Sequence, residues 1–424
     1  MVKMEKAYKF RAYPSKDTQA VLNRQMFLSK ELYNLLLEKS KAYYKETGKT
    51  LTEYRMNVWI TSLKKERPEF AEIHSQVLQN VSKRISDAYK SFFRRCKEKK
   101  HGKKVKVGFP RYKKFVSSLT YPQLGFKVER KKVLLSKIGS INFVNHREIE
   151  GRVKTCNIKK TKEGKWYIAF SVEQVDKPFI SNSKGKVGID LGITQYVALS
   201  DKSPIIQNAK ITKHQRNHLK TLQQIVSRKT KGSNKRKKAV KNLAKYHNYI
   251  SNIRQNMLHQ ISRNLVSSYS FIAYEELQIQ NMVKNHRLAR SISESSWGNF
   301  LQLLQYKAES AGCVAVGVKP QYTSMTCNKC GNIQEMLLSK RTFVCERCNH
   351  TEDRDINASQ NILDRGLALI KALNSKSSNF DSFTVKTTAG LAGSQAPKDI
   401  VRPSLGKANV NERGTILEGV HLDR

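Results

Sequence analysis

The sequence lacks the segments that would place a protein in a membrane or in an oxidising compartment. No apolar run reaches the roughly 18–20 residues of a membrane span, and residues 1–6 contain no apolar core of a signal peptide. An even-numbered disulfide framework is also missing: of seven cysteines, four form one cluster and Cys96, Cys156 and Cys313 stand apart. This pattern is typical of a metal site with free thiols in a reducing compartment. We therefore expect a cytoplasmic protein without a membrane partner.

Acidic residues are scarce. The 424-residue chain has 34 Asp and Glu against 79 Lys and Arg, a formal net charge of +45. Self-repulsion at this charge is costly unless a polyanion offsets it, and each phosphate that a cation neutralises releases a counterion. The charge is not confined to one amphipathic segment, which disfavours an anionic membrane. We therefore expect nucleic acid to be the partner, rather than a merely charged surface.

Two blocks carry much of the positive charge. Residues 202–274 contain sixteen Lys and Arg and no Asp or Glu, and residues 94–114 contain eleven Lys and Arg and one Glu. A solvated helix face usually mixes both signs, so a block of one sign favours contact with phosphates. Phe109 and Tyr112 interrupt the shorter block and are suited to stacking on bases. The candidate contacts in these blocks include Arg111, Lys113, Lys235 and Arg236.

Apolar periodicity predicts two structural regions. A strand at 5–13 precedes helices at 15–46, 51–65 and about 75–96, and short strands then predict a small β-barrel or sheet over about 104–175. Beyond a linker at 176–186, strands alternate with helices and predict an α/β domain. The strands of the first region are expected at 105–107, 126–128, 132–135, 141–143 and 166–170. Those of the second are expected at 187–190, 195–200, 271–275 and 313–318, with helices at about 210–229, 234–268, 296–311 and 356–373.

The cysteine cluster predicts a zinc site. Cys327 and Cys330 are separated by two residues, as are Cys345 and Cys348, with fourteen residues between the pairs. Two such pairs can converge on one tetrahedral Zn²⁺. Four thiolates leave the ion no open position, so its role would be structural.

Three acidic positions suggest hydrolytic chemistry. Asp190 and Glu275 each end an apolar strand, and Asp355 stands at the start of a helix. Carboxylates from separate elements around one sheet are what two Mg²⁺ ions about 3.5–4 Å apart require. A helix cap and a surface salt bridge are the simpler roles for Asp355 and Glu275. The pattern alone does not choose between Glu275 and Glu276 or between Asp353 and Asp355.

Taken together and in this order, these motifs resemble the TnpB family, the accessory proteins of bacterial and archaeal insertion sequences. The resemblance covers nearly the whole chain. Its motifs lie at 6–14, 107–114, 188–192, 274–277 and 323–324, at the four cysteines and at 353–358.

The resemblance implies a multidomain α+β and α/β fold. It comprises a β-barrel wedge (1–13 and 104–180) interrupted by a helical recognition lobe (14–103), then an RNase H-like RuvC nuclease (181–320 and 351–373) with an inserted zinc ribbon (321–350) and a flexible, largely disordered tail (374–424).

It also implies an RNA-guided, Mg²⁺-dependent DNA endonuclease, with Asp190, Glu275 and Asp355 as the catalytic carboxylates and ligands of two Mg²⁺ ions. The expected partners are a guide RNA from the transposon end and double-stranded target DNA, bound by a monomer in a ribonucleoprotein associated with the nucleoid. A short motif beside the target would be read by the protein itself. Residues in comparable regions are Tyr54, Gln79, Asn80 and Gln123, for which ordinary packing is the alternative.

Three other functions remain open from the sequence. A strand-joining transposase of the rolling-circle type would need a His-x-His pair with a downstream Tyr, and the sequence has no His-x-His. A guided DNA-binding repressor that does not cut, and a compact CRISPR effector, share the same motifs.

Overall fold

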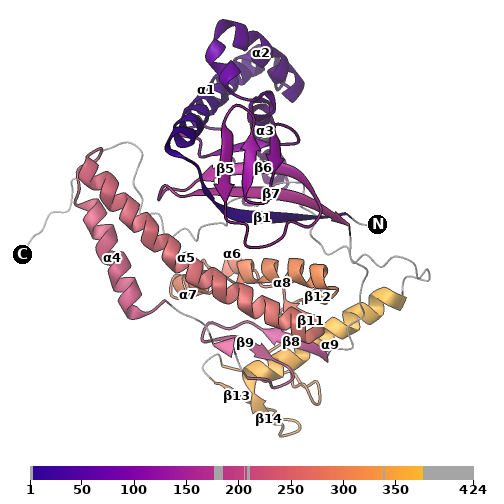
Figure 1. The fold of residues 1–424 in the computed structure, drawn as a ribbon. Helices are drawn as coiled ribbons and strands as arrows, with labels where there is room; N and C mark the ends of the chain where they lie inside the picture. Colours follow the sequence, from indigo (N-terminus) through magenta and orange to yellow (C-terminus); the bar gives the residue numbers. More distant parts are fainter. Residues whose placement is uncertain (1–2, 176–184, 205, 208–210, 338–339, 376–424) are drawn as a thin grey trace, which may run out of the picture. The chain divides into compact units, whose positions relative to one another are not determined.

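The computed structural model describes residues 3–175, 185–204, 206–207, 211–337 and 340–375 (Figure 1). The chain divides into two compact units, Met1–Asp176 and Lys177–Arg424. Most of the predicted linker and the predicted disordered tail beyond residue 375 lie outside the described residues. Across these ranges, no helix is both long and apolar enough to cross a membrane.

The first unit begins with a strand and three helices, which confirms the predicted order. Ser15 begins the first helix, because its side chain accepts a hydrogen bond from the Thr18 backbone N–H. Gly48 ends that helix in the left-handed conformation that glycine adopts without strain. The elements are β1 (Lys3–Tyr13), α1 (Lys16–Thr47), α2 (Glu53–Glu66), the 3₁₀ helix η1 (Pro68–Glu72) and α3 (Ser75–Lys100).

The strands of this unit form one antiparallel sheet in the order β2-β6-β7-β1-β5-β4-β3. Tyr121 of β2 donates a hydrogen bond to the carbonyl of Ser136, just after β4, at 2.9 Å. In a flat sheet, five strand spacings of ~4.8 Å would separate these strands by about 24 Å. The sheet is therefore strongly curled and approaches a barrel. The strands are β2 (Ser118–Tyr121), β3 (Phe126–Val128), β4 (Lys132–Leu135), β5 (Gly139–Phe143), β6 (Arg152–Lys160) and β7 (Trp166–Val175).

One predicted strand in this region is wrong, and two were missed. Residues 105–107 form no strand, whereas β2 and β6 belong to the sheet. Downstream in the same irregular segment, the Asn34 side chain takes the place of a strand partner. It donates to the Lys113 carbonyl at 3.0 Å and accepts from the Lys113 N–H at 2.8 Å.

The second unit contains a five-stranded sheet in the order β10-β9-β8-β11-β12. Strand β8 is parallel to β11, and β11 to β12, while β9 runs antiparallel to β8. This confirms a mixed α/β unit. Its strands are β8 (Gly185–Asp190), β9 (Gln195–Leu199), β10 (Ile206–Gln207), β11 (Tyr269–Glu275) and β12 (Val314–Val318), with a separate hairpin of β13 (Thr342–Val344) and β14 (Thr351–Asp353). Its helices are α4 (Lys213–Ser227), α5 (Asn234–Ser268), α6 (Ile279–Met282), α7 (Ala289–Ser295), α8 (Trp297–Ala311) and α9 (Arg354–Ser375).

Side chains of β11 alternate between the two faces of this sheet. Ile272 and Tyr274 belong to the core that includes α5 and α8, whereas Phe271 and Ala273 belong to the core that includes Ile362 of α9. With a period of two residues, Glu275 points to the α9 face. Helix α9 thus covers the face of the sheet on which the strand-borne acids lie.

A glycine allows α9 to lie directly against β8. A Cβ atom at Gly188 would come within 2.0 Å of the Ser359 carbonyl oxygen and 2.7 Å of the Leu363 nitrogen. Both are backbone atoms of α9, which cannot rotate away as a side chain could. Asp190, two residues along the same strand, faces the same side as Gly188 and therefore the start of α9.

Candidate active site and zinc centre

Three acidic residues meet at one edge of the second sheet. The parallel register pairs Tyr274 with Ile189, so the next residues, Glu275 and Asp190, are neighbours on adjacent strands. Asp355 lies in the first turn of α9. Glu275 and Asp355 are 8% and 6% exposed, and Asp190 is half-buried. These are the residues that the sequence singled out for metal-dependent hydrolysis.

The three carboxylates share one electrostatic environment. Burial raises the pKa of Asp190 to about 8, and the charges of Glu275 and Asp355 add to this shift. The N–H of Leu191 and the charge of Arg354 oppose it. Burial also raises the pKa of Glu275, against a hydrogen bond from a neighbouring hydroxyl. Carboxylates brought together in this way favour either a shared proton or bound cations.

Thr323 donates the hydrogen bond that orients Glu275. Its hydroxyl lies 2.5 Å from Glu275 Oε1 and 3.1 Å from the Pro320 carbonyl. A hydroxyl has one proton to donate, and a carboxylate oxygen is a stronger acceptor than a carbonyl oxygen. The Thr323 proton therefore goes to Glu275, which is also the closer of the two acceptors. The buried Thr323 therefore fixes one oxygen of Glu275. The motif that includes Thr323 was recognised in the sequence, but its role becomes visible only in the structure.

The structure also separates the ambiguous acids. Asp353 Oδ1 accepts hydrogen bonds from the backbone N–H groups of Asp355 and Ile356 at 2.8 and 3.2 Å, which makes Asp353 the residue that caps α9. Asp355 instead pairs with Arg341 at 3.1 Å and Arg354 at 3.2 Å. The helix cap first considered for Asp355 is thus the role of its neighbour.

Burial and hydrogen bonding distinguish Glu275 from Glu276. Glu275 is buried and hydrogen-bonded to Thr323, whereas Glu276 is exposed. The surface salt bridge considered for Glu275 does not fit its burial.

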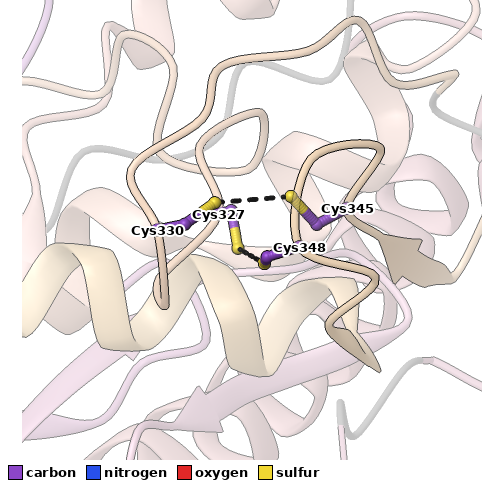
Figure 2. A group of neighbouring side chains, drawn as sticks. All are labelled: Cys327, Cys330, Cys345 and Cys348. Carbon is purple, nitrogen blue, oxygen red and sulfur yellow. Dashed lines mark hydrogen bonds between the residues drawn. The ribbon is translucent and has the colours of Figure 1, made fainter.

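The four cysteines converge, as Figure 2 shows. Their sulfur atoms all lie within 4.8 Å of one another. The Cys327–Cys348 and Cys330–Cys345 sulfur pairs are 3.7 and 3.5 Å apart. Tetrahedral Zn²⁺ with Zn–S bonds of about 2.3 Å requires sulfur–sulfur distances of about 3.8 Å. The cluster therefore has the size of a zinc–thiolate site.

The two cysteine loops have the same backbone design. Gly331 donates to the Cys327 carbonyl at 3.0 Å, and Asn349 donates to the Cys345 carbonyl at 2.9 Å. Both Gly331 and Asn349 have positive φ, at 72° and 53°. Burial would raise the pKa of Cys345, but hydrogen bonds from the N–H groups of Cys348 and Arg347 and from the Cys330 and Cys348 thiols outweigh it and lower the pKa to about 6. The thiol hydrogen bonds instead raise the pKa of Cys348 to about 12. The N–H groups of this loop thus favour a thiolate at Cys345, the form that a metal binds.

Helix α9 joins the zinc centre to the acidic site. Asn357 donates to the Thr326 carbonyl at 2.8 Å and accepts from the Asn328 N–H at 3.0 Å. Asn361 donates to the carbonyls of Thr323 and Thr326 at 2.9 and 2.7 Å. The segment that carries the first cysteine pair and Thr323 is therefore held by two buried amides of the helix that begins with Asp355. Periodicity gives no signal for such amides.

The predicted nucleic-acid contacts of the helical region have different surroundings. Tyr54 is 76% exposed, and Gln79 is exposed on α3. Asn80 accepts a hydrogen bond from Arg84 Nε at 2.8 Å. The N–H of Gln123 donates to Gln76 at 3.1 Å. The first two side chains are available to a ligand, and their role in nucleic-acid binding stays a prediction.

The short basic block is partly engaged within the protein. Phe109 packs edge-on against Tyr89 and Phe92, with ring centroids 5.4 and 5.2 Å apart. The ammonium of Lys113 lies 4.3 Å from the Tyr33 ring centroid. Arg111 is exposed.

In the long basic block, α4 and α5 form a hairpin. Arg236 donates to the carbonyls of Val226 and Lys229 at 2.6 and 3.0 Å, where it satisfies the end of α4. Lys235 is exposed, and α4 has no buried residue. The block thus combines a structural arginine with a solvent-facing basic surface.

Three family models match the chain. The models are described as "Helix-turn-helix domain" (residues 1–49), "Probable transposase" (169–286) and "Cas12f1-like, TNB domain" (297–362). A Streptomyces pristinaespiralis protein, provisionally named an RNA-guided DNA endonuclease, is 31% identical over 379 residues, 87% of this chain and 91% of that protein. "TnpB-like protein L79" of Acanthamoeba polyphaga mimivirus is 28% identical over 227 residues, 50% of this chain and 44% of that protein. The chain belongs to the TnpB family.

The fold of this chain is also similar to that of a solved structure. The structure of a Cas12f1–sgRNA–target DNA complex aligns over 85% of this chain and 98% of that chain, with 14% identity and a TM-score of 0.51. The region matched as helix-turn-helix contains strand β1 followed by the single long helix α1.

The raised pKa of Asp190 predicts a pH-dependent stability. In the unfolded chain this carboxyl titrates near 4, so between about pH 4 and pH 8 the folded state binds a proton that the unfolded state lacks. Stability is therefore lost as the pH rises, by at most ~1.4 kcal/mol per pH unit. In buffer without divalent cations, Asp190→Asn should show a shallower fall in melting temperature from pH 5 to pH 8 than the wild type. The exposed Asp364→Asn is the matched control, and equal slopes for all three proteins would contradict the prediction.

The sulfur geometry predicts one zinc ion per chain. Elemental analysis should find a 1:1 ratio in the purified protein, and Cys330→Ser and Cys345→Ser should each lose most of it, because the ion then lacks a thiolate ligand. Cys96→Ser, which changes a cysteine of α3 outside the cluster, should retain the metal. Full zinc content in the cluster variants would refute the assignment.

Proposed function

We propose that this protein is an RNA-guided, Mg²⁺-dependent DNA endonuclease of the RuvC type. The observation that carries the proposal is the convergence of Asp190, Glu275 and Asp355 on one face of the second sheet. Two come from the ends of parallel strands and the third from the helix that covers that face. Relatives provisionally named RNA-guided DNA endonucleases support the same activity.

The acidic site fits a pair of hard divalent cations. All three side chains offer carboxylate oxygens, the ligands that Mg²⁺ prefers. Burial, and after it the charges of Glu275 and Asp355, raise the pKa of Asp190, and bound cations would offset both effects. Asp190, Glu275 and Asp355 would hold the two ions, and these would supply the Lewis acidity for water activation and for stabilising the leaving oxygen of a phosphodiester. Thr323 orients Glu275, and the Asp353 cap fixes the start of α9 and hence Asp355.

Arg341 and Arg354 supply positive charge beside the same site. Both guanidinium groups contact Asp355, and the Arg341 side chain is 53% exposed. An exposed guanidinium next to the proposed reaction centre can donate to the non-bridging oxygens of a phosphate. This arrangement favours cleavage of a phosphodiester over simple metal storage.

The partners follow from the charge and from the family. We propose a guide RNA from the transposon end and a double-stranded DNA target beside a short motif, both bound by a monomeric protein. The exposed Lys and Arg side chains of the α4–α5 hairpin offer a phosphate-binding surface. A bound polyanion would also offset the repulsion within a chain of net charge +45. Tyr54 and Gln79 are the exposed candidates for contact with the flanking motif.

A guided repressor that binds DNA without cutting is the second candidate. It requires RNA and DNA binding but no carboxylate site. The presence of all three acids at the ends of neighbouring strands and of α9 favours the nuclease, since such a site would carry a cost in folding energy without a benefit to a repressor.

Cleavage assays with matched acid variants test the proposed nuclease. The protein is purified with its bound RNA and given Mg²⁺ and a duplex matching the variable end of that RNA. Asp190→Asn, Glu275→Gln and Asp355→Asn should each lower the cleavage rate by about 10²-fold or more, because transition-state charge loses its support. Asp353→Asn, which keeps an oxygen for the helix cap, and Glu276→Gln should cut at near wild-type rates.

Binding of the same duplex separates the two candidates. Normal guide-dependent binding without cutting by the wild-type protein would favour the repressor. The absence of any bound RNA would overturn both.

The Thr323 hydroxyl provides a separate test of metal positioning. Thr323→Val keeps the shape but removes the donor to Glu275, so the Mg²⁺ concentration for half-maximal cleavage should rise by about 10-fold or more. Thr323→Ser should restore the wild-type value, because it restores the hydroxyl. A purely structural role would leave the Mg²⁺ dependence unchanged in both variants, with only stability altered.

A further inference from the structure

The first unit contains a cavity that lies outside the acidic and zinc sites. It has a volume of about 450 Å³, within the roughly 300–1,000 Å³ of ligand-binding pockets. Three parts of the unit line it: α1, the segment just before β2, and the end of β6 with the turn that follows it. None of the expected nucleic-acid contacts named from the sequence lines this cavity.

Two phenylalanines of the lining are exposed. Phe27 of α1 is 51% exposed and Phe115 is 67% exposed. Neither belongs to the packed core of the unit. Their exposed area is apolar surface that an aromatic ligand can cover, and every nucleobase has a face that stacks on such a ring.

The charged residues that line the cavity are all lysines, and no carboxylate is among them. Lys160 is held in place, because its ammonium donates to Asn23 Oδ1 at 2.8 Å. Lys30 lies 4.2 Å from the Phe27 ring centroid and also pairs with Glu31 at 2.5 Å. Lys114 and Lys162 line the cavity and are exposed. An anion with an aromatic part is the ligand that matches this combination.

We propose that this cavity binds an unpaired nucleotide of the RNA, with its base against Phe27 and Phe115 and its phosphates on the lysines. A base can enter a concave site only when it is unpaired and unstacked. Folded RNA presents such bases in loops and bulges, whereas a DNA duplex must first be opened at a cost of a few kcal/mol. Ser117 and Thr161 also line the cavity, and their hydroxyls can bond to a base edge or a 2′-hydroxyl.

This inference rests on the proposed RNA partner and assigns it a specific contact point. The probes are a 12-nucleotide oligouridylate and the oligothymidylate of equal length, with the full-length protein freed of its own RNA. Phe115→Ala and Phe27→Ala should each weaken oligouridylate binding by about 5-fold or more, the loss of one base–aromatic stack. Phe115→Tyr should bind as the wild type does.

Two further variants separate stacking from general charge and packing. Tyr44→Ala removes an exposed aromatic ring from the same helix α1 outside the cavity and should leave binding unchanged. Lys114→Gln and Lys162→Gln should each reduce the slope of log affinity against log salt by about 0.7 for a lost phosphate contact. With 5-iodouridine in the oligonucleotide, ultraviolet cross-links should map to Phe27 or Phe115.

The possible failures are distinguishable. Wild-type binding of oligouridylate that neither phenylalanine variant weakens would overturn the cavity while leaving the proposed nuclease intact. A larger loss for oligothymidylate than for oligouridylate would overturn the assignment to RNA. Failure of the wild-type protein to retain RNA on purification or to bind either oligonucleotide would instead overturn the proposed function itself.

Discussion

The burial of three neighbouring carboxylates, nearly complete for Glu275 and Asp355 and partial for Asp190, is the constraint on which the second unit depends. Asp190 and Glu275 cannot move apart, because they end hydrogen-bonded parallel strands. Asp355 is brought to them by α9, whose backbone lies so close to β8 that only glycine fits at position 188. The raised pKa of Asp190 is the energetic signature of this arrangement. A site that is unfavourable without cations is one in which cation binding is coupled to the stability of the fold.

The cysteine cluster and the acidic site are connected through hydrogen bonds and share no residue. Asn357 and Asn361 of α9 donate hydrogen bonds to the carbonyls of Thr326 and Thr323, which lie just before the first cysteine pair. The Thr323 side chain in turn donates to Glu275. An ion held by the four cysteines would fix one end of this segment. Metal binding at a closed, structural site can therefore influence the geometry of a reactive site without taking part in the chemistry.

Much of this organisation could be predicted from the sequence. Strands with apolar runs, long periodic helices and the four cysteines depend on local patterns, and these were located to within a few residues. Residues 105–107 show the limit: Val-Lys-Val has the composition of a strand, but this segment is irregular, and the Val105 N–H bonds locally to the Lys103 carbonyl. The residue pattern alone left Asp353 and Asp355 open, and only the family resemblance favoured Asp355. The structure adds the physical difference: Asp353 caps α9, whereas Asp355 pairs with Arg341 and Arg354.

The basic blocks show why composition alone cannot assign contacts. Arg236 and Phe109 lie in segments typical of nucleic-acid binding. Arg236, however, donates a hydrogen bond to a carbonyl at the end of α4, and Phe109 packs against aromatic rings of α3. Phe27 and Phe115 attract no attention in the sequence, because one lies in an amphipathic helix and the other in a loop. The curled sheet and α1 bring them to one cavity beside four lysines. Recognition of an unpaired base depends on such three-dimensional convergence, whereas the attraction of a polyanion requires only the charge.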